Sequence, residues 1–513
     1  MNVLGYLEIQ SYLERVKGDV VGQISTDAKD RFFSREYAFE SIKGSKISVH
    51  RRNGKGDTIT FSSRIPLTEE IVAFFGLYSG DGSKGVESSN DPSRLLATIS
   101  FSQKETNLIK FALRAFKELF GESINFTYSI GEDSAFFLAG EGNQLLSQSY
   151  GGTLPLTKPL NEIRSKLNEA DLRYLSETRS QPLDNETYLA FYYQHKDKMN
   201  DILIGIKRKE LIDSGVELRP SDTVTASVRR PFKKGAREHG GTSRADELYL
   251  TGVNGFGELF LKMLYEIELS IEHDSELSPE GLVRWNGKPS TIGEIISVEQ
   301  FFKEDHYGKI GKSRPIFVKR GNHLYGKWSG SREIALNSSL RISPLFCYAS
   351  GLYLAEGDTP KSEIFNGFAK SSKRFSLGFG SSEDSSIFII LASLEALFEG
   401  EILDAWKIKV GSQYFPELVL TGLREGVPML RGGKSGDGKL RTMEISLAVK
   451  KWALETYPSL ERFEDKYSHV EPTGAGVARA QFWTSSTLAR WYFPLIVYVL
   501  FHNYVKEPEA EFR

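Results

Sequence analysis

Cysteine is almost absent from this chain of 513 residues, since Cys347 is its only copy. One cysteine excludes an internal disulfide and a zinc site built from cysteines, so the chain fits a reducing compartment and we expect a cytoplasmic protein. Histidine is scarce too, and the 8 histidines show no metal-binding spacing such as His-Glu-x-x-His. Cys347 lies in an apolar run and is expected in the core.

Long hydrophobic runs are also missing. The longest one, Trp491–Phe501, is interrupted by Pro494 and is shorter than the ~20 residues that cross a bilayer. The first residues contain no basic region and reach Glu8 early, which is unlike a signal peptide. We therefore expect no membrane partner.

The chain also lacks an excess of charge of either sign. Lys and Arg total 65 and Asp and Glu total 67, which gives a formal net charge of -2. This balance counts against a nucleic-acid binder, which usually carries a basic excess, so any such role must depend on local clusters. The 40% hydrophobic and 26% charged content is that of an ordered globular protein. Because one core stops growing at roughly 250–300 residues, two or three domains are expected.

Two stretches far apart in the chain share one pattern. Phe74–Gly82 reads FFGLYSGDG and Ala349–Gly357 reads ASGLYLAEG, each an apolar helical run with small residues at the third and seventh places. Each has an acid at the eighth place and a glycine at the ninth, where a helix stops. The spacing predicts two helices that end on Asp81 and Glu356.

The small residues lie four positions apart, Gly76 with Gly80 and Gly351 with Ala355, and therefore on one face of each helix. Small side chains there allow two helices to approach closely. If the helices pack through these faces, Asp81 emerges beside the acid of the second helix.

Two acids at helix C-termini are unfavourable, since the macrodipole alone costs about 0.3–1 kcal/mol for each. A divalent cation reverses the sign of the local field, and Mg²⁺ binds through one or two carboxylates together with phosphate and water oxygens. The pair predicts a metal site for Mg²⁺ or Mn²⁺ held by Asp81 and Glu356. The alternative is that both helices are simply core and the acids only terminate them.

The elements after each motif follow one order, which predicts an α+β fold with an internal duplication. Shared Ser-Ser and Arg-Ile pieces before the motifs, at 62–65 and 338–342, suggest that the duplicated unit starts upstream of the helix. The elements expected after the first motif are strand Arg94–Gln103, helix Leu108–Leu119, strands Ile124–Ile130 and Ser134–Ala139, and a helical stretch near Asn143–Ser149. Those expected after the second motif are strand Phe375–Gly380, helix Ser386–Phe398, and strands Ala405–Val410 and Glu417–Thr421.

The long spacing between the motifs predicts extra material in the middle of the chain. The expected divisions are an N-terminal extension at 1–66, a first half at 67–165, an inserted domain or long linker at 166–336 with a helix at Gly257–Leu269, a second half at 337–444, and a largely helical C-terminal segment at 445–513.

Both stretches resemble the motif of the LAGLIDADG homing endonucleases, in two blocks near 67–150 and 341–430. The resemblance implies two αββαββα halves in a monomeric pseudo-dimer, each with a saddle-shaped sheet in the DNA major groove. It also implies that the eighth-position acids, matched by Asp81 and Glu356, bind the metals that hydrolyse one phosphodiester on each strand. Gln103 matches a water-positioning Gln of the family, where the second half has Ser381. Arg424 matches a basic residue near the scissile phosphate, and the first half has no equivalent at 138–142.

Several polar and basic groups are expected to contact double-stranded DNA. The polar strand faces that match the saddle are formed by Thr98, Ser100, Ser102 and Ser376, with Gly378 and Gly380. The turn before the second strand of the later half carries Lys370, Lys373 and Arg374. A dense basic cluster, which reads either as a DNA arm or as a solvated charge run, contains Arg229, Arg230, Lys233, Lys234 and Arg237. The role of Arg51 and Arg52 is left undecided.

The sequence therefore predicts a metal-dependent endonuclease that cuts duplex DNA at a specific site, with asymmetry between the halves that leaves room for nicking. One alternative is a catalytically silent DNA-binding or regulatory protein on the same scaffold, and another is an RNA-binding maturase. A self-splicing intein is excluded because His502-Asn503 precedes Tyr504 inside an apolar helix and no junction residue follows.

Overall fold

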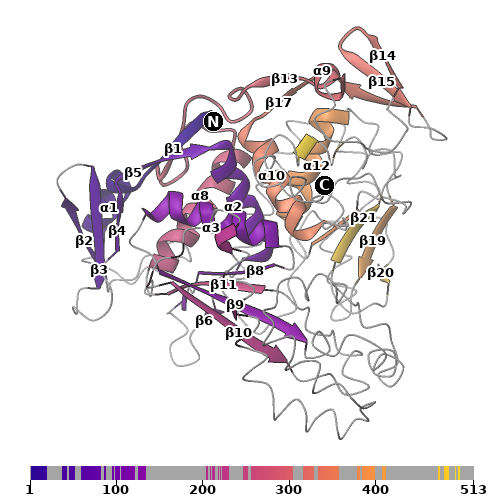
Figure 1. Ribbon diagram of the computed structural model, residues 1–513. Coiled ribbons are helices and arrows are strands. Elements are labelled where there is room, and N and C mark those ends of the chain that lie inside the picture. The colour runs from indigo at the N-terminus through magenta and orange to yellow at the C-terminus, as the bar shows by residue number, and fades with distance from the viewer. Residues whose placement is uncertain are drawn as a thin grey trace, which may run out of the picture. The chain divides into compact units, whose positions relative to one another are not determined.

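The chain is analysed in a computed structural model, which contains helices and small sheets in a mixed α+β arrangement (Figure 1). The described residues are 2–19, 37–42, 45–51, 59–82, 86–87, 95–96, 99–103, 106–121, 125–133, 222–229, 246–251, 256–303, 316–327, 333–357, 378–381, 384–398, 407–411, 472–473 and 479–483, with single residues from 201 to 220 and from 492 to 496. No described helix is long and apolar enough to span a bilayer.

The chain divides into two compact units. Unit 1 comprises Met1–Ile99, Ala115–Ser123 and Val253–Arg513, and unit 2 comprises Ser100–Arg114 and Ile124–Gly252. Both predicted motif helices belong to unit 1.

The motif helices form as predicted. They are α2 (Glu69–Asp81) and α10 (Pro344–Glu356), and their first turns are capped by the side chains of Thr68 and Ser343. Each cap oxygen accepts the backbone N–H three residues on, at 3.3 Å from Ile71 and 3.2 Å from Phe346. Such caps satisfy donors that a helix N-terminus otherwise leaves unpaired.

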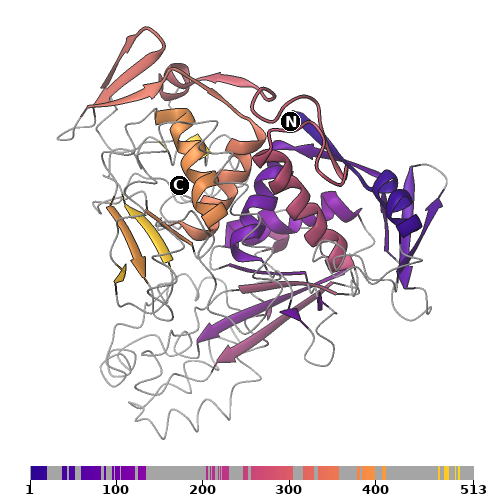
Figure 2. The same ribbon diagram turned by 180° about the vertical axis from the view of Figure 1, so that it is seen from behind.

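The two motif helices pack against each other through glycine, which confirms the predicted contact. A Cβ added to Gly76 would clash with the backbone carbonyl of Tyr348, and one added to Gly351 would clash with the carbonyl of Ala73. Figures 1 and 2 show α2 and α10 side by side from opposite directions. The backbones touch here, so only glycine fits at these two positions.

Three more helices surround the pair. They are α8 (Phe256–Glu272), α12 (Asp384–Phe398) and α3 (Thr106–Phe120), which begins in unit 2 and ends in unit 1. Phe260 of α8 lies edge-to-face against Tyr78 at 4.7 Å between ring centroids, and Phe116 of α3 lies edge-to-face against Phe74 at 4.8 Å. Such pairs add about 0.5–1.5 kcal/mol to the burial of the rings themselves.

A module of one helix and small antiparallel sheets precedes each motif helix. The first module (residues 3–68) runs β1 (Val3–Glu8), α1 (Ile9–Asp19), β2 (Tyr37–Ile42), β3 (Lys46–Arg51), β4 (Ile59–Ser62) and β5 (Arg64–Thr68). The second module (residues 295–341) runs β13 (Ile295–Ser297), α9 (Val298–Lys303), β14 (Ile316–Arg320), β15 (His323–Lys327), β16 (Ile334–Asn337) and β17 (Ser339–Arg341). Each module has a three-stranded sheet, β2-β3-β4 or β14-β15-β16, and its last strand pairs with its first.

Two hydrogen bonds recur in the modules. The N–H of Ser63 donates to the carbonyl of Ser45 at 2.8 Å, and the N–H of Ser338 donates to the carbonyl of Asn322 at 2.8 Å. The carbonyls of the same serines accept the N–H groups of Gln10 and Val298 at the starts of α1 and α9, at 3.1 and 3.0 Å. The serine before the last strand therefore makes the same two backbone contacts in both modules.

A four-stranded sheet follows each motif helix, and the strand order is the same in both. Unit 2 contains β10-β9-β11-β8 and unit 1 contains β20-β19-β21-β18. The first two strands in each order are parallel to each other, β10 with β9 and β20 with β19. The third strand, β11 or β21, runs antiparallel to both of its neighbours. The strands are β8 (Ser100–Gln103), β9 (Asn125–Asp133), β10 (Thr223–Arg229), β11 (Asp246–Thr251), β18 (Gly378–Ser381), β19 (Lys407–Gly411), β20 (Pro472–Thr473) and β21 (Arg479–Trp483). The short strands that complete the chain are β6 (Val86–Glu87), β7 (Leu95–Leu96) and β12 (Val283–Trp285).

These pairings change the expected divisions of the chain. The range 166–336 supplies β10 and β11 to a sheet with β8 and β9, and most of the second module, so it is not one inserted domain. The range 445–513, expected to be largely helical, supplies β20 and β21. The expected divisions fail because each four-stranded sheet contains two strands from much later in the chain, β10 and β11 in one sheet and β20 and β21 in the other. The strands expected at 134–139 and 417–421 lie outside the described residues.

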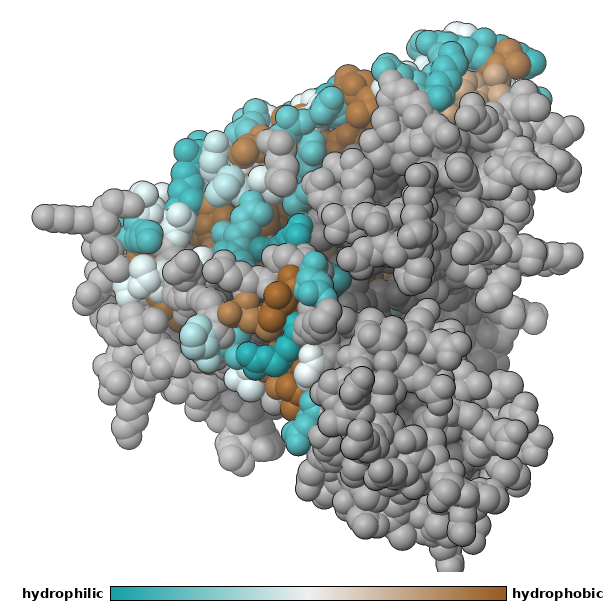
Figure 3. All heavy atoms as spheres, viewed as in Figure 1, coloured by the Kyte–Doolittle hydropathy of each residue, from teal (hydrophilic) through white to brown (hydrophobic). Residues whose placement is uncertain are grey.

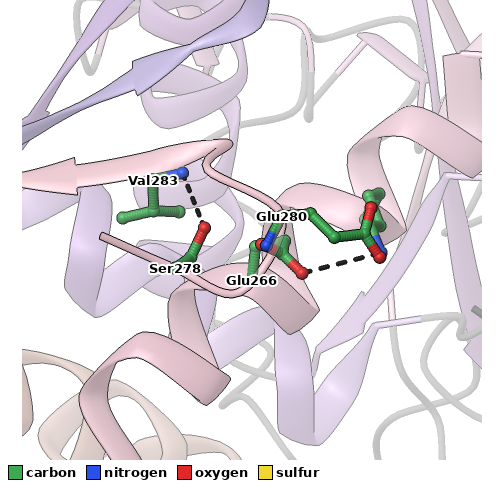
Figure 4. A network of polar contacts seen from close by, with 5 residues as sticks. Glu266, Ser278, Glu280 and Val283 are labelled. Atoms are coloured by element: carbon green, nitrogen blue, oxygen red, sulfur yellow. Dashed lines mark hydrogen bonds and ion pairs between the residues drawn. The ribbon is translucent and has the colours of Figure 1, made fainter. Parts of the chain in front are cut away.

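Several acids are buried on α8. Lys262 forms ion pairs with Glu266 and Glu280, and Glu266 also accepts the backbone N–H of Glu280 at 3.0 Å (Figure 4). Val283 donates its backbone N–H to the hydroxyl of Ser278 at 3.0 Å in the same turn. These contacts hold the loop after α8 against the helix.

Glu268 and Glu272 lie on the same helix. Glu268 accepts a hydrogen bond from the hydroxyl of Tyr348 at 3.0 Å, whereas neither carboxylate oxygen of Glu272 has a hydrogen-bond partner among the described residues. Burial, followed by the charge of Glu268, raises the pKa of Glu272 well above its ordinary value. The raised pKa favours the uncharged acid form of Glu272 in the folded protein.

Replacing Gly76 or Gly351 by alanine is expected to destabilise the fold by about 1–3 kcal/mol or more, because the new methyl group meets backbone. A matched control is Gly205→Ala, since a Cβ at helical Gly205 meets nothing within 4 Å. That variant should be neutral or slightly stabilising. Thermal unfolding of the three variants checks this, and equal melting temperatures would contradict the close approach of α2 and α10.

Replacing Glu272 by methionine is expected to stabilise the protein at pH 7 by about 1–3 kcal/mol. The native pKa is raised, so the stability of the wild type is greatest below the unfolded pKa, near ~4.3, and falls as pH rises towards the native pKa. The gain in Glu272→Met should therefore vanish near pH 4. Glu272→Gln removes the titration but keeps a polar group, so its stability should lose the same pH dependence. A gain that does not change with pH would refute a neutral Glu272.

Candidate metal and phosphate site

The two motif acids are the last residues of their helices, Asp81 of α2 and Glu356 of α10. A Cβ added to Gly80 would clash with the Cβ of Ala355 and lie 3.1 Å from Cγ of Glu356. The side chain of Glu356 therefore lies against the residue that precedes Asp81. The helices thus bring both acids to the same end of the pair, and both are half-buried there.

Each acid stands on the same local scaffold. The N–H of Gly82 donates to the carbonyl of Tyr78 at 2.7 Å, and the N–H of Gly357 donates to the carbonyl of Tyr353 at 2.7 Å. The tyrosine rings lie directly beneath these glycines, so a side chain on either glycine would meet the ring. Both tyrosines are buried, which fixes the backbone that carries each acid.

Another aromatic ring packs against each tyrosine. Tyr353 lies edge-to-face against Tyr492 at 5.4 Å, as Tyr78 does against Phe260. The sequence already contains the signal for this support, because Gly-Leu-Tyr occupies the same places in both motifs. Sequence reasoning singled out the glycines and acids and did not assign a role to the tyrosines.

The electrostatics of this end favour a cation. Neither helix has a basic residue in its last turn, and both present their negative dipole ends beside a carboxylate. Asp and Glu oxygens are hard ligands of the kind that Mg²⁺ and Mn²⁺ prefer. Among the described residues no group of three or more His, Cys, Asp or Glu is placed to hold a metal.

The strand that carries the predicted polar face has a buried apolar face. Ile99 and Phe101 are buried, and Ser100 between them is half-buried. Gln103 shares the face of Phe101, is itself buried, and pairs in register with Asp246 of β11. It belongs to unit 2, whereas the two acids belong to unit 1.

The remaining predicted contacts fall into two groups. Ser102 pairs in register with Glu247, and Arg229 is the last residue of β10, opposite Asp133. The predicted residues outside the described part of the chain are Thr98, Ser376, Lys370, Lys373, Arg374, Arg230, Lys233, Lys234, Arg237 and Arg424.

No protein-family model, curated protein or solved structure matches the chain in sequence or fold. The resemblance to the LAGLIDADG endonucleases therefore rests on the two sequence motifs alone.

Without a metal, the two acids should reduce the stability of the helix pair. Asp81→Asn and Glu356→Gln are each expected to raise stability by about 0.3–1 kcal/mol in the presence of EDTA, because each removes negative charge from a helix C-terminus. Glu70→Gln in the first turn of α2 is the matched control and should lower stability by a similar amount. Chemical denaturation in low salt measures all three, and a loss of stability in both acid variants would show that the acids are structural.

Proposed function

We propose that this protein is a LAGLIDADG-type DNA endonuclease that uses a divalent metal to hydrolyse phosphodiester bonds at a specific site in duplex DNA. The observation that carries the proposal is the contact between the ends of α2 and α10, where Gly80 meets Ala355 and Glu356. It places one carboxylate from each motif at a shared end of two packed helices. Each carboxylate faces the negative end of its helix dipole, and a bound cation would offset the negative charge of both acids.

Reciprocal contacts between α2 and α10 support the proposal. Gly76 faces the carbonyl of Tyr348, which is three residues before Gly351, while Gly351 faces the carbonyl of Ala73, which is three residues before Gly76. Reciprocal contacts of this kind are the mark of an isologous interface. A pseudo-dimer built this way would present one carboxylate to each of the two DNA strands, whose backbones have the same geometry.

The repeated architecture gives further support. Each half contains an upstream module, a motif helix, a strand, a second helix of 15 residues (α3 or α12) and a four-stranded sheet of one strand order. Duplex DNA is itself nearly twofold symmetric in its backbone. A protein with two similar sheets could offer a related surface to each strand of the duplex.

In this proposal the residues have distinct tasks. Asp81 and Glu356 bind the cations, which would lower the pKa of bound water and stabilise the leaving oxygen. The carboxylates are held at a fixed separation by Tyr78, Tyr353 and the cap glycines. Little conformational entropy is therefore lost when the metal binds. Specific recognition belongs to the sheets.

A catalytically silent DNA-binding or regulatory protein on the same scaffold is the second candidate. It is favoured by the small number of ligands, since the described residues add no third carboxylate or histidine to the two acids. The two candidates differ only in whether bound DNA is cut.

The test is a nuclease assay on a library of duplex targets with Mg²⁺ or Mn²⁺, with EDTA as the blank. We expect the wild type to cut a small set of sites, and Asp81→Asn together with Glu356→Gln to abolish cutting while binding is kept. Glu70→Gln lies at the opposite end of α2 and should cut normally. A loss of at least a thousandfold is expected for the double variant, since catalytic groups contribute several kcal/mol.

Binding without cleavage over the whole library would favour the silent protein. Cleavage that survives the loss of both acids would refute their catalytic role. Absence of any duplex binding would refute both candidates.

A further inference from the structure

A cavity lies beside the start of the second motif helix. It has a volume of about 230 Å³ and is bounded by β17, the first turn of α10 and the last turns of α12, with Ser290 and Ile295 at its rim. All of these residues belong to unit 1. Figure 1 shows β17 leading into α10 beside α12. The cavity is separate from the motif acids, because α10 has 13 residues and is about 20 Å long at ~1.5 Å per residue, with Glu356 at its far end.

One face of the two-stranded sheet β13–β17 forms a wall of the cavity. Arg341 pairs in register with Ile295, and Ser339 lies two residues before Arg341, so these three side chains share one face. Ile295 is 55% exposed, whereas Arg341 is half-buried. Figure 3 shows hydrophobic residues beside hydrophilic ones on the upper edge of the view, where β13 and β17 run. The wall therefore offers an apolar side chain and a cation to the same ligand.

The guanidinium of Arg341 lacks a counter-ion. It donates one hydrogen bond, from Nη1 to the carbonyl of Gly293 at 3.2 Å, and forms no ion pair within the described part of the chain. A guanidinium has five N–H donors, so several remain available. The arginine in the last strand of the first module differs, since Arg64 is exposed and still pairs with Glu8 at 3.0 Å. A less exposed arginine without a carboxylate partner points to an anion from outside the chain.

Another wall is the positive end of α10. Its first turn contains no acid, and the backbone N–H of Leu345 has no acceptor among the described residues. The hydroxyl oxygen of Ser343 accepts the N–H of Phe346, which leaves its own proton free to donate. At the same place α2 carries two carboxylates, Glu69 and Glu70. A helix N-terminus favours a negative charge, and at α10 the chain supplies none in the first turn.

The rest of the lining is largely apolar. Leu340, Leu345 and Phe346 are buried, and Ala396 of α12 has a side chain too small to fill the space. None of the described residues that line the cavity is acidic. At the rim, the carboxylate of Asp274 accepts the N–H and the hydroxyl of Ser290 at 2.8 and 2.7 Å. The cavity thus combines one cation with apolar walls.

We propose that this cavity binds a small organic carboxylate with an apolar body, such as a short-chain or aromatic acid. The carboxylate accepts hydrogen bonds from Arg341, whose parallel N–H groups match two carboxylate oxygens, and the apolar body lies against Ile295, Leu345 and Phe346. The volume is below the ~300–1,000 Å³ of pockets for drug-sized ligands, so the ligand is smaller than a nucleotide. The site is independent of the proposed nuclease activity.

The experiment measures binding to the full chain at pH 7 by isothermal titration calorimetry, with benzoate and hexanoate as probes. Benzyl alcohol lacks the charge and inorganic phosphate lacks the apolar body, so these are the comparison ligands. We expect both carboxylates to bind and to raise the melting temperature with increasing concentration, because a ligand of the folded state stabilises it. The comparison ligands should bind more weakly by roughly tenfold or more.

Three variants locate the site. Arg341→Gln should weaken benzoate binding by roughly tenfold to a hundredfold, the usual worth of hydrogen bonds to a charged group, and Arg341→Lys should recover part of this loss. Ala396→Leu fills the cavity and should abolish binding although Arg341 is intact. Arg284→Gln is the matched control, since it removes an exposed arginine of β12 that does not line the cavity, and it should bind benzoate as the wild type does.

Failure of both carboxylates to bind at millimolar concentrations would overturn the inference. Equal benzoate affinity in the wild type and Arg341→Gln would overturn it too, as would equal affinity in Ala396→Leu or an equal affinity for benzyl alcohol. Circular dichroism and the melting temperature without ligand show whether the variants fold. If Arg341→Gln does not fold, Ala396→Leu and the uncharged ligand still decide. DNA cutting plays no part in these measurements, so the result stands apart from that of the nuclease assay.

Discussion

The backbone contact between α2 and α10 is the constraint on which the rest of unit 1 depends. Two apolar helices, buried on almost every face, cross where neither has a side chain, at Gly76 and Gly351. The contact fixes the distance between the helix axes and also their parallel register, because Gly80 and Ala355 meet one turn later. The relative position of the two acids is a consequence of this register, and it needs no contact between the acids themselves.

The residues that surround α2 differ from those that surround α10. On the side of α2, Phe75 stacks on Phe260 at 5.5 Å in an apolar cluster. The residue of α10 at the same motif place is Ser350, which lies beside Tyr492, and burial raises the pKa of that tyrosine above its ordinary value. The α8 side has in addition the acids Glu268 and Glu272 against Tyr348.

The similarity between the two parts of the chain extends to the modules that precede the motif helices. In each half the serine before the last strand ties a hairpin turn to the start of a helix, through bonds of 2.8 to 3.1 Å. This ties the module rigidly to the strand that enters the motif helix.

Sequence alone determined the local elements at the core of the protein. The caps of α2 and α10, their glycine faces and their terminal acids all follow from residues within 15 positions of one another, where helix periodicity and capping act. It also determined the apolar face of β8, since strand alternation is local. Tertiary structure alone decided which strands share a sheet. β11 begins at residue 246 and joins β8 and β9, which end by residue 133. β21 begins at residue 479 and joins β18 and β19, which end by residue 411. Strand pairing depends on hydrogen bonds between segments and carries no local signal in either segment. For the same reason the sequence could propose that Asp81 and Glu356 meet, but only the packing of two distant helices through glycine brought them to one end.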